Sequence, residues 1–289
     1  MSRLPDFLVK RIPKQNNMRK MRLLLDDSGI HTVCEEARCP NIGECFLKKT
    51  CTFMILGSVC TRNCAFCALP AGRQGVKKGT PLPPDPEEPK KIAEAAKKLG
   101  LDYVVVTSVT RDDLPDGGAG QFAKVIAQLR MSNAECRIEV LIPDFNGKAE
   151  ALQTVLYAKP YVLNHNIETV PRLYPKIRPQ ANYEHSLNIL LNAKQSGKVV
   201  YTKSGFMVGL GETRDEIIKV LEDLKETGCD IVTIGQYLSP SREHIKPERF
   251  VLPEEFEAFR SFGKSLGFLA VFSGPFVRSS YHAAEILNV

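Results

Sequence analysis

From about residue 51 onward, short apolar segments alternate with amphipathic ones, and this order restricts the folds open to the chain. The apolar segments have the length of β-strands, and the segments between them repeat apolar residues with the period of an α-helix. In 214–228, Ile217, Leu221 and Leu224 form one such stripe, and Gly228 provides a stop. The expected strands are 51–57, 101–108, 136–142, 161–167, 198–208, 229–237 and 268–272, and the expected helices are 89–100, 119–130, 147–158, 183–197, 214–228 and 253–267.

Strict alternation of strand and helix with mostly short connections predicts right-handed βαβ units and a parallel sheet. About six or seven such units in roughly 220 residues suit a barrel better than an open doubly wound sheet. No GxGxxG motif follows the first strand, which also argues against a dinucleotide fold. We therefore predict an α/β protein with a partial or full (β/α) barrel of about six parallel strands at 51–272. A cysteine-rich segment at 1–50 precedes it, and a tail at 273–289 follows.

The charge of the chain is concentrated in an N-terminal arm. The net charge is +6, and residues 1–22 hold seven basic residues and one acid, which account for all of it. The remainder carries 32 basic and 32 acidic residues, and this neutral body argues against a nucleic-acid groove over the fold. The arm is either a solvated extension or a docking site for an acidic partner. Its basic residues are Arg3, Lys10, Arg11, Lys14, Arg19, Lys20 and Arg22.

Cysteine usage indicates metal binding inside the cell. The chain has nine cysteines, of which seven fall between Cys34 and Cys67. The arm lacks the apolar stretch of a secretory signal, and no apolar run approaches the roughly 20 residues that span a bilayer. Clustered cysteines in such a chain point to metal rather than to disulfide bonds. We therefore predict a cytoplasmic protein that has no membrane segment.

The most specific motif is "CTRNCAFC", in which Cys60, Cys64 and Cys67 follow a C-x3-C-x2-C spacing. No fourth cysteine follows at a matching interval. Because a [4Fe–4S] cluster takes one thiolate per iron, three thiolates leave one iron open to bind a small molecule. Structural zinc usually takes four ligands in spaced pairs, and an electron-transfer ferredoxin would close all four irons. Both alternatives therefore match the motif less well.

A second triplet lies upstream in "CEEARCPNIGEC", where Cys34, Cys39 and Cys45 follow a C-x4-C-x5-C spacing. Two incomplete triplets this close in sequence suggest two separate clusters. The alternative is a structural cluster or a zinc ion that attaches the arm to the barrel. The other cysteines open apolar segments, which is typical of small core residues. They are Cys51, Cys136 and Cys229.

These motifs resemble those of a known superfamily and of one family within it. The CxxxCxxC loop, with Phe66 inside it, is similar to that of the radical S-adenosylmethionine (SAM) superfamily. The resemblance implies a barrel of the radical SAM type, in which Cys60, Cys64 and Cys67 hold a [4Fe–4S] cluster that binds SAM. Nearly the whole chain resembles the lipoyl synthase family, through "CEEARCPNIGEC", "VTSVTRDDLPDGGA", "NHNIETVPRLY", "KSGFMVGLGET", "GQYLSPS" and "GPFVRSSYHA".

In that family the first triplet holds an auxiliary [4Fe–4S] cluster, which a serine of an RSSY motif completes. The motif stands here at 278–281, so the resemblance implies Ser280, directly before Tyr281, as the fourth ligand. Arg278 would support the same site. An alkoxide oxygen is a harder donor than thiolate and matches iron–sulfur units less well, so its iron should be the easiest to release.

The resemblance also implies an activity, namely insertion of two sulfur atoms at carbons 6 and 8 of an octanoyl chain on a carrier-protein lysine. These carbons resist acid–base and nucleophilic chemistry, but a 5′-deoxyadenosyl radical from SAM can abstract their hydrogens. One SAM would serve each carbon, and the auxiliary cluster would donate its sulfide and be degraded. The implied partners are a lipoyl domain or the H protein of glycine cleavage as carrier, a flavodoxin or ferredoxin as electron donor, and an iron–sulfur cluster carrier.

Several polar side chains are expected on the rim of the barrel, where strands end and SAM needs partners for its ribose, amino-acid end and adenine. Capping of loops and hydrogen bonds at the barrel mouth are the alternative role for each of them. The candidates are Phe66, Thr107, Ser108, Asn166, Glu168, Lys203, Gln236 and Leu238.

Two other functions stay open at this point. One is a different sulfur-inserting radical enzyme, similar to biotin synthase or to methylthiolating proteins, which use other auxiliary ligands. The second is an iron–sulfur electron carrier or scaffold, whose single redox-active cluster would not react with SAM. An iron count after reconstitution distinguishes the lipoyl synthase hypothesis from an electron carrier, because lipoyl synthase requires two four-iron clusters.

Overall fold

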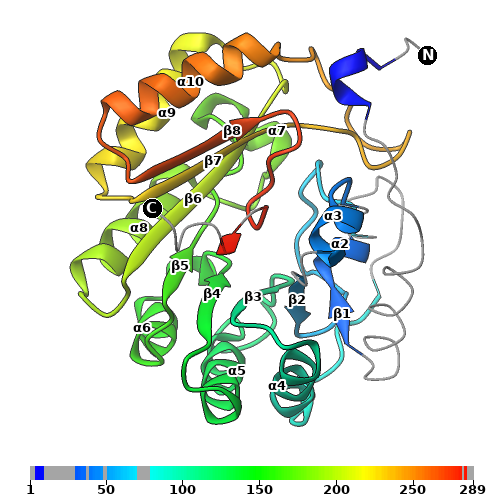
Figure 1. Cartoon of the computed structure of the whole chain (residues 1–289), viewed down its shortest axis with the longest axis vertical. Helices are drawn as coiled ribbons and strands as arrows, with labels where there is room; N and C mark the ends of the chain where they lie inside the picture. The colour runs from blue at the N-terminus through cyan, green and yellow to red at the C-terminus, as the bar shows by residue number, and fades with distance from the viewer. Residues whose placement is uncertain are drawn as a thin grey trace.

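The computed structural model describes residues 4–9, 30–36, 39–47, 51–69, 79–281 and 283–284, so the basic residues of the arm lie outside the described part. One eight-stranded sheet runs in the order β1 to β8 (Figure 1). Strand β1 (His31–Thr32) pairs antiparallel with β2, and all later neighbours pair in parallel. The parallel strands are β2 (Thr52–Ile55), β3 (Tyr103–Ser108), β4 (Arg137–Leu141), β5 (Val162–Asn164), β6 (Tyr201–Val208), β7 (Ile231–Gln236) and β8 (Ala270–Gly274).

This architecture confirms the predicted α/β fold with a parallel sheet. The parallel strands number seven rather than about six, because the last apolar segment, 268–272, also forms a strand. Within the described residues no pairing joins β2 to β8, so the barrel is partial rather than closed. The strand ends therefore surround a mouth that is open on one side.

Longer helices lie outside the arc of strands (Figure 1). Thr213 and Glu216 start α9 with a capping box, in which each side chain accepts a hydrogen bond from the other's backbone N–H. Gly100 ends α4 in the left-handed region, at φ 62°. These helices are α4 (Glu88–Leu99), α5 (Ala119–Ser132), α6 (Ala149–Tyr157), α8 (Tyr183–Gln195), α9 (Arg214–Glu226) and α10 (Pro253–Ser265).

Several short helices were not expected from the sequence. Two lie in the first cysteine segment, and two lie directly before α8. Because a single turn leaves little room for a periodic pattern, such elements carry a weak sequence signal. They are η1 (Asp6–Leu8), α2 (Val33–Glu36), α3 (Ile42–Leu47), η3 (Phe145–Gly147), η4 (Pro171–Leu173) and α7 (Tyr174–Ile177).

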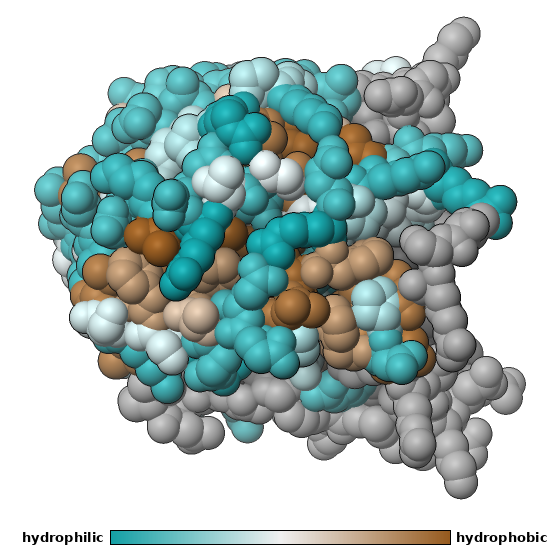
Figure 2. Space-filling model, turned by 90° about the horizontal axis from the view of Figure 1, so that it is seen from above, coloured by the Kyte–Doolittle hydropathy of each residue, from teal (hydrophilic) through white to brown (hydrophobic). Residues whose placement is uncertain are grey.

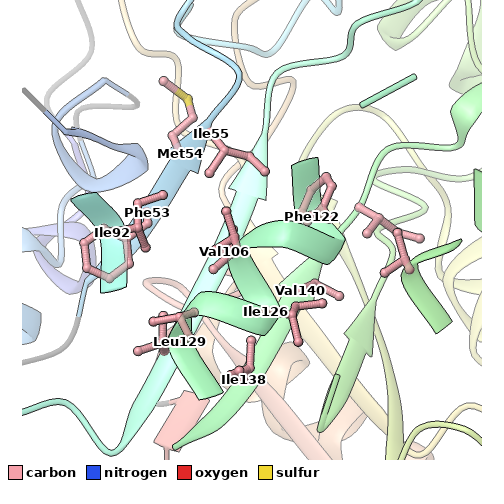
Figure 3. Packing of buried hydrophobic residues seen from close by; sticks show 14 of the residues in the cluster. Phe53, Met54, Ile55, Ile92, Val106, Phe122, Ile126, Leu129, Ile138 and Val140 are labelled. Carbon is pink, nitrogen blue, oxygen red and sulfur yellow. The ribbon is translucent and has the colours of Figure 1, made fainter. Parts of the chain in front are cut away.

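The hydrophobic core lies between the sheet and its outer helices. Figure 3 shows Phe122 and Ile126 of α5 packed near Val106 and Val140 of neighbouring strands. All four side chains are at most 1% exposed. Each such side chain contributes about 1.5–3 kcal/mol through burial, so this layer fixes the strands whose ends surround the mouth.

The first cysteine segment and the C-terminal tail lie next to each other at the mouth, although they are far apart in the sequence (Figure 1). Asn41 Nδ2 donates a hydrogen bond to the carbonyl oxygen of Phe276 at 2.7 Å. Tyr281 Oη donates to Glu44 Oε1 at 3.0 Å. Since β1 joins the sheet of the barrel, the N-terminal segment and the barrel are continuous there, and the domain boundaries at 50 and 272 stay a prediction.

Among the helices that the structure describes, none has the length and apolar character needed to cross a membrane. On the face seen in Figure 2, hydrophobic residues gather in a band that hydrophilic side chains interrupt. A mixture of this kind is ordinary for a protein surface.

Candidate active site

One cavity of about 450 Å³ lies at the carboxyl ends of the parallel strands. Thr107 of β3, Leu141 of β4 and Gln236 of β7 contribute to its wall, as expected for the functional end of a barrel. Both cysteine triplets reach it, the first through all three cysteines and the second through one. The cysteines of the triplets in the wall are Cys34, Cys39, Cys45 and Cys67, and Cys51 and both serines of the RSSY motif, Ser279 and Ser280, join them.

The CxxxCxxC loop follows β2 and is clamped to two neighbouring loops by Arg62, whose side chain is only 4% exposed. Its guanidinium donates to both carboxylate oxygens of Asp112 at 2.8 and 3.0 Å and to both of Asp144 at 2.6 Å. A further bond reaches Asn146 Oδ1 at 2.6 Å. Since Asp112 follows β3 and Asp144 follows β4, one side chain fixes the loop against two strand ends.

The second and third cysteines of this loop lie in a desolvated setting. Burial raises the pKa of Cys64 to about 11, although the charge of Arg178 acts in the opposite direction, and burial raises that of Cys67 to about 12. Each thiol is also disfavoured as an anion by its cysteine neighbours. Such thiols become thiolates readily only when a cationic group binds them, as in a metal site.

The first triplet has similar electrostatics. Burial raises the pKa of Cys34 to about 12, and the nearby thiols of Cys39 and Cys45 raise it further. All three cysteines line the same cavity. Within the described residues, no three cysteine, histidine or acidic groups are grouped as a single metal ion requires. An iron–sulfur cluster is larger than one ion and takes its ligands farther apart. The assignment of a cluster to each triplet stays a prediction.

A polar trio in the wall joins the loop after β5 to the C-terminal tail. Asn166 Nδ2 donates to Glu168 Oε1 at 3.0 Å and to Ser279 Oγ at 2.6 Å. Asn166 Oδ1 is buried and has no hydrogen-bond partner among the described residues. Burial raises the pKa of Glu168, whose backbone takes the left-handed conformation at φ 64°, rare for a residue with a side chain. An unpaired acceptor beside a buried carboxylate on a strained backbone is a feature of binding sites.

Comparison with known proteins decides which family this cavity belongs to. The family model described as "Radical SAM superfamily" matches residues 54–235, and that described as "N-terminal domain of lipoyl synthase of Radical_SAM family" matches residues 1–39. A lipoyl synthase of Caldicellulosiruptor saccharolyticus is 54% identical over 285 residues, covering 99% of this chain and 98% of that protein. This chain belongs to the lipoyl synthase family. A second family member, from Caldanaerobacter subterraneus, is 53% identical over 281 residues, or 97% of this chain and 96% of that protein.

Solved structures at low sequence identity share the fold of this lipoyl synthase family member. Methylornithine synthase (PylB) matches with a TM-score of 0.55 and 15% identity, covering 77% of this chain and 71% of that one. SuiB of Streptococcus suis bound to its precursor peptide matches with a TM-score of 0.57 and 11% identity, covering 95% and 58%. Membership of the superfamily makes the chain a radical SAM enzyme, with a [4Fe–4S] cluster and SAM as its cofactors.

Most of the SAM contacts predicted for this family member lie at the cavity. Thr107 Oγ1 donates to the carbonyl oxygen of Leu141 at 2.8 Å, whereas Ser108 Oγ is buried without a partner among the described residues and lies outside the wall. Gln236 is held by the backbone of the loop after β7, since its Oε1 accepts from Val251 N at 2.8 Å. The predicted contacts in the wall are Phe66, Thr107, Asn166, Glu168, Gln236 and Leu238, and the predicted support Arg278 joins them.

Lys203 lies away from the cavity wall. It is 1% exposed, and its Nζ lies 3.0 and 3.2 Å from the two carboxylate oxygens of Glu139. Tyr103 Oη and Asn164 Nδ2 also donate to this carboxylate, at 2.7 and 2.9 Å. The structure therefore places Lys203 in a buried polar layer inside the barrel, where its ammonium group is paired with Glu139. Contact with SAM stays a prediction for this residue.

Sequence reasoning missed two arginines of the site. Arg62 belongs to the CxxxCxxC motif, but its contacts lie on loops about 50 and 82 residues away, so the sequence assigns it no role. Arg178 follows α7, donates to the carbonyl oxygen of Asn166 at 2.9 Å, and has a buried Nε without a partner among the described residues. Neither position carries a spacing pattern that the sequence alone could reveal.

Proposed function

We propose that this member of the lipoyl synthase family inserts two sulfur atoms, at carbons 6 and 8, into an octanoyl group held on a lysine of a lipoyl-carrier protein. It would hold two [4Fe–4S] clusters, of which the auxiliary one supplies the sulfur. It would consume two molecules of SAM per product. The proposed ligands are Cys60, Cys64 and Cys67 for the SAM-binding cluster and Cys34, Cys39, Cys45 and Ser280 for the auxiliary cluster.

The observation that supports this proposal best is the shared cavity. All four proposed auxiliary ligands and Cys67 of the other triplet contribute to the same wall, although more than 200 residues separate Ser280 from the cysteines. Insertion of sulfur into an unactivated C–H bond requires the radical source and the sulfur source to reach the same carbon atoms. Two clusters with unrelated roles would not need a common cavity.

Each part of the wall has a task in this proposal. The clusters and SAM would supply a carbon-centred radical and sulfide, which no side chain provides. Asn166 Oδ1, which has no partner among the described residues, and the Glu168 carboxylate would accept hydrogen bonds from ribose hydroxyls. Apolar wall residues such as Leu141, Met207 and Val277 would pack on the octanoyl chain and exclude water.

The decisive experiment is anaerobic reconstitution followed by an iron count and mass spectrometry of an octanoylated carrier peptide. We expect about eight irons per chain, methionine and 5′-deoxyadenosine from SAM, and a product that gains two sulfurs and loses two hydrogens. A chain that holds about four irons, or zinc, would contradict the proposal. Formation of 5′-deoxyadenosine without any sulfur in the product would favour another radical SAM function.

Two variants at the auxiliary site sharpen this test. Ser280→Cys should preserve SAM cleavage and the iron count but impair sulfur transfer, because thiolate would hold its iron more firmly than alkoxide. Cys51→Ala is the matched control, since Cys51 is buried in the same wall but belongs to the hydrophobic core. It should keep about eight irons. A loss of about four irons in Cys51→Ala would reassign the fourth ligand.

The remaining partners and the compartment are proposed from family resemblance. A flavodoxin or ferredoxin would deliver electrons, and an iron–sulfur cluster carrier would rebuild the auxiliary cluster, in the cytoplasm. The basic arm would dock an acidic carrier protein through Lys10, Arg11 and Lys14. Charge reversal there should raise the KM for carrier protein and leave activity on a short octanoyl-lysine peptide intact. Equal losses on both substrates would refute the docking role.

A further inference from the structure

The two serines of the RSSY motif lie side by side in sequence but belong to different parts of the cavity. Ser280 is the proposed fourth ligand of the auxiliary cluster. Ser279 Oγ instead accepts a hydrogen bond from Asn166 Nδ2 at 2.6 Å, and both serines line the cavity. This bond joins the C-terminal tail to the loop after β5, which is 113 residues earlier. It is the shorter of the two bonds made by that amide group.

The bond restricts how Asn166 presents its acceptor. The amide nitrogen is held between Glu168 Oε1 and Ser279 Oγ, so the oxygen must lie on the opposite side. That oxygen is buried without a partner among the described residues, next to Gly205, where a Cβ would approach it to 3.1 Å. Removal of the Ser279 hydroxyl would leave Glu168 as the only side-chain anchor of the amide group among the described residues.

The tail is itself positioned by the barrel rather than by its own secondary structure. At Gly235 of β7 a Cβ would collide with the carbonyl oxygen of Val277 and lie 3.1 Å from its carbonyl carbon. The absence of a side chain there lets the tail cross β7 closely enough for Ser279 to reach Asn166. Tail and barrel loop are therefore held as one unit.

We propose that Ser279 is a positioning residue that orients Asn166 for SAM, so the C-terminal tail takes part in SAM binding as well as in the auxiliary site. This inference rests on the proposed function, in which Asn166 contacts SAM and Ser280 ligates iron. The two adjacent serines then serve different cofactors. Ser279 sets the affinity for SAM, and Ser280 sets the iron content of the auxiliary cluster.

The test measures SAM affinity and iron content in reconstituted, unreduced enzyme, where no turnover occurs. By anaerobic equilibrium dialysis, Ser279→Ala should raise the Kd for SAM about fivefold, the size expected for one lost hydrogen bond, and should keep both clusters. Ser279→Thr retains a hydroxyl and should restore the Kd to within about twofold. Under reducing conditions Ser279→Ala should raise the KM for SAM about fivefold and change kcat for 5′-deoxyadenosine formation less than twofold.

Ser280→Ala is the matched comparison, because it removes the neighbouring hydroxyl from the same tail. It should lower the iron count by up to about four per chain and leave the Kd for SAM within about twofold. An unchanged Kd in Ser279→Ala, or a loss of auxiliary iron in that variant, would overturn the inference.

Failure of the proposed function itself would look different. If Ser280→Ala kept all its iron, the assignment of Ser280 as a cluster ligand would be wrong. A raised Kd for SAM in Ser279→Ala would still support the inference. If Asn166→Ala bound SAM with normal affinity, the proposed contact between Asn166 and SAM would be wrong, and so would the positioning role of Ser279.

Discussion

The two cysteine triplets lie at the same cavity but are held in place by different forces. The CxxxCxxC loop is clamped by a buried arginine that bonds to two carboxylates and an amide, all on loops of the barrel. In the first triplet, Cys34 and Cys45 lie on the short helices α2 and α3, and Cys39 lies between them. Bonds that connect this segment to the C-terminal tail include Asn41 to Phe276 and Tyr281 to Glu44. The first arrangement belongs to the folded barrel, whereas the second brings two ends of the chain together.

This difference matches the fates proposed for the two clusters. A cluster that persists through turnover profits from a loop whose geometry cannot relax, and buried charge-assisted hydrogen bonds provide that. A cluster that is consumed and rebuilt needs ligands that can separate without disrupting the core. Each of the two hydrogen bonds named above contributes only about 1 kcal/mol, far less than a buried ion pair. The predictions below test this contrast, beginning with the strongest expected effect.

The largest effect is expected from Arg62→Met, which breaks the clamp of the CxxxCxxC loop. The side chain of Asp144 is 4% exposed, so its carboxylate would stay buried without its cation. Removal of one partner from such a pair costs about 3–5 kcal/mol. The free energy of unfolding in urea should fall by that amount. About four of eight irons should be lost, those of the SAM-binding cluster.

A matched arginine on the surface controls for charge and size. Arg172 makes a similar two-pronged contact with Glu216, at 2.7 and 2.9 Å, but its side chain is 56% exposed. Arg172→Met should therefore cost less than about 1 kcal/mol and leave both clusters in place. If Arg62→Met kept a full complement of iron, the clamp would not be what holds that loop.

Gly235→Ala tests the path of the tail, and we expect a cost of up to about 3 kcal/mol. The added Cβ would collide with the Val277 carbonyl group, which is backbone and cannot rotate away. The tail should shift from β7, with loss of auxiliary iron and weaker SAM binding. Gly274 is the register partner of Gly235 on β8, and a Cβ there meets only Val277 Cγ2 at 3.5 Å. Gly274→Ala should therefore be nearly neutral by both iron count and urea unfolding.

The loss of stability at low pH tests the barrel part of this comparison, through the buried residue His165. Burial, followed by the charge of Arg178, lowers the pKa of His165 to about 4 from 6.5. The unfolded chain therefore binds this proton first, so the stabilising contribution is complete above pH 6.5 and declines as the pH falls toward 4. At pH 5 this difference in pKa lowers the free energy of unfolding by about 2 kcal/mol relative to neutral pH.

A pair of histidine variants isolates this contribution. Urea unfolding at pH 7 and pH 5 should show a smaller acid loss in His165→Asn than in the wild-type chain. His185 is an exposed residue of α8, and His185→Asn serves as the control that should behave like the wild type. Equal acid losses in all three proteins would show that His165 does not set the acid sensitivity.

The barrel could be predicted from sequence because its signal is local and repeated. Runs such as Val104–Val106 are buried on both faces, and a βα pattern that recurs along the chain admits few topologies. Strand β1 and helices α2 and α3 were missed because two to six residues carry no readable period. The conformation of the first cysteine segment also depends on contacts with a tail about 235 residues later.

For the candidate site, the spacing of the cysteines predicted the two triplets, and the RSSY motif suggested Ser280. The sequence did not show how deep in the barrel each polar side chain lies or which way it points. Lys203 and Asn166 are both polar residues near strand ends in the sequence. Lys203 is the third residue of β6, deep enough in the barrel to meet Glu139, whereas Asn166 lies beyond the end of β5, in the wall. A period of two tells which face a residue occupies and says nothing about how far along the barrel axis it lies.

The smallest effect is expected from Tyr281→Phe, which removes one bond between the tail and α3. Tyr281 Oη donates to Glu44 Oε1 at 3.0 Å, in a partly buried setting. The loss should cost about 1 kcal/mol or less in urea unfolding. The informative readout is the iron lost on dilution with a chelator, because we expect auxiliary iron to leave several times faster while the SAM-binding cluster keeps its wild-type rate.

Tyr183→Phe provides the matched comparison for this last variant. Tyr183 Oη donates to Asp223 Oδ2 at 2.8 Å, also partly buried, but it connects α8 to α9 on the outer layer. Both variants therefore lose a tyrosine hydroxyl bonded to a carboxylate, and their costs in unfolding free energy should be similar. If iron leaves both at the same rate, the bond to Glu44 contributes only stability. If only Tyr281→Phe releases auxiliary iron faster, the weak contact between the chain ends controls how readily that cluster comes apart, whereas the barrel clamp leaves its own cluster unaffected.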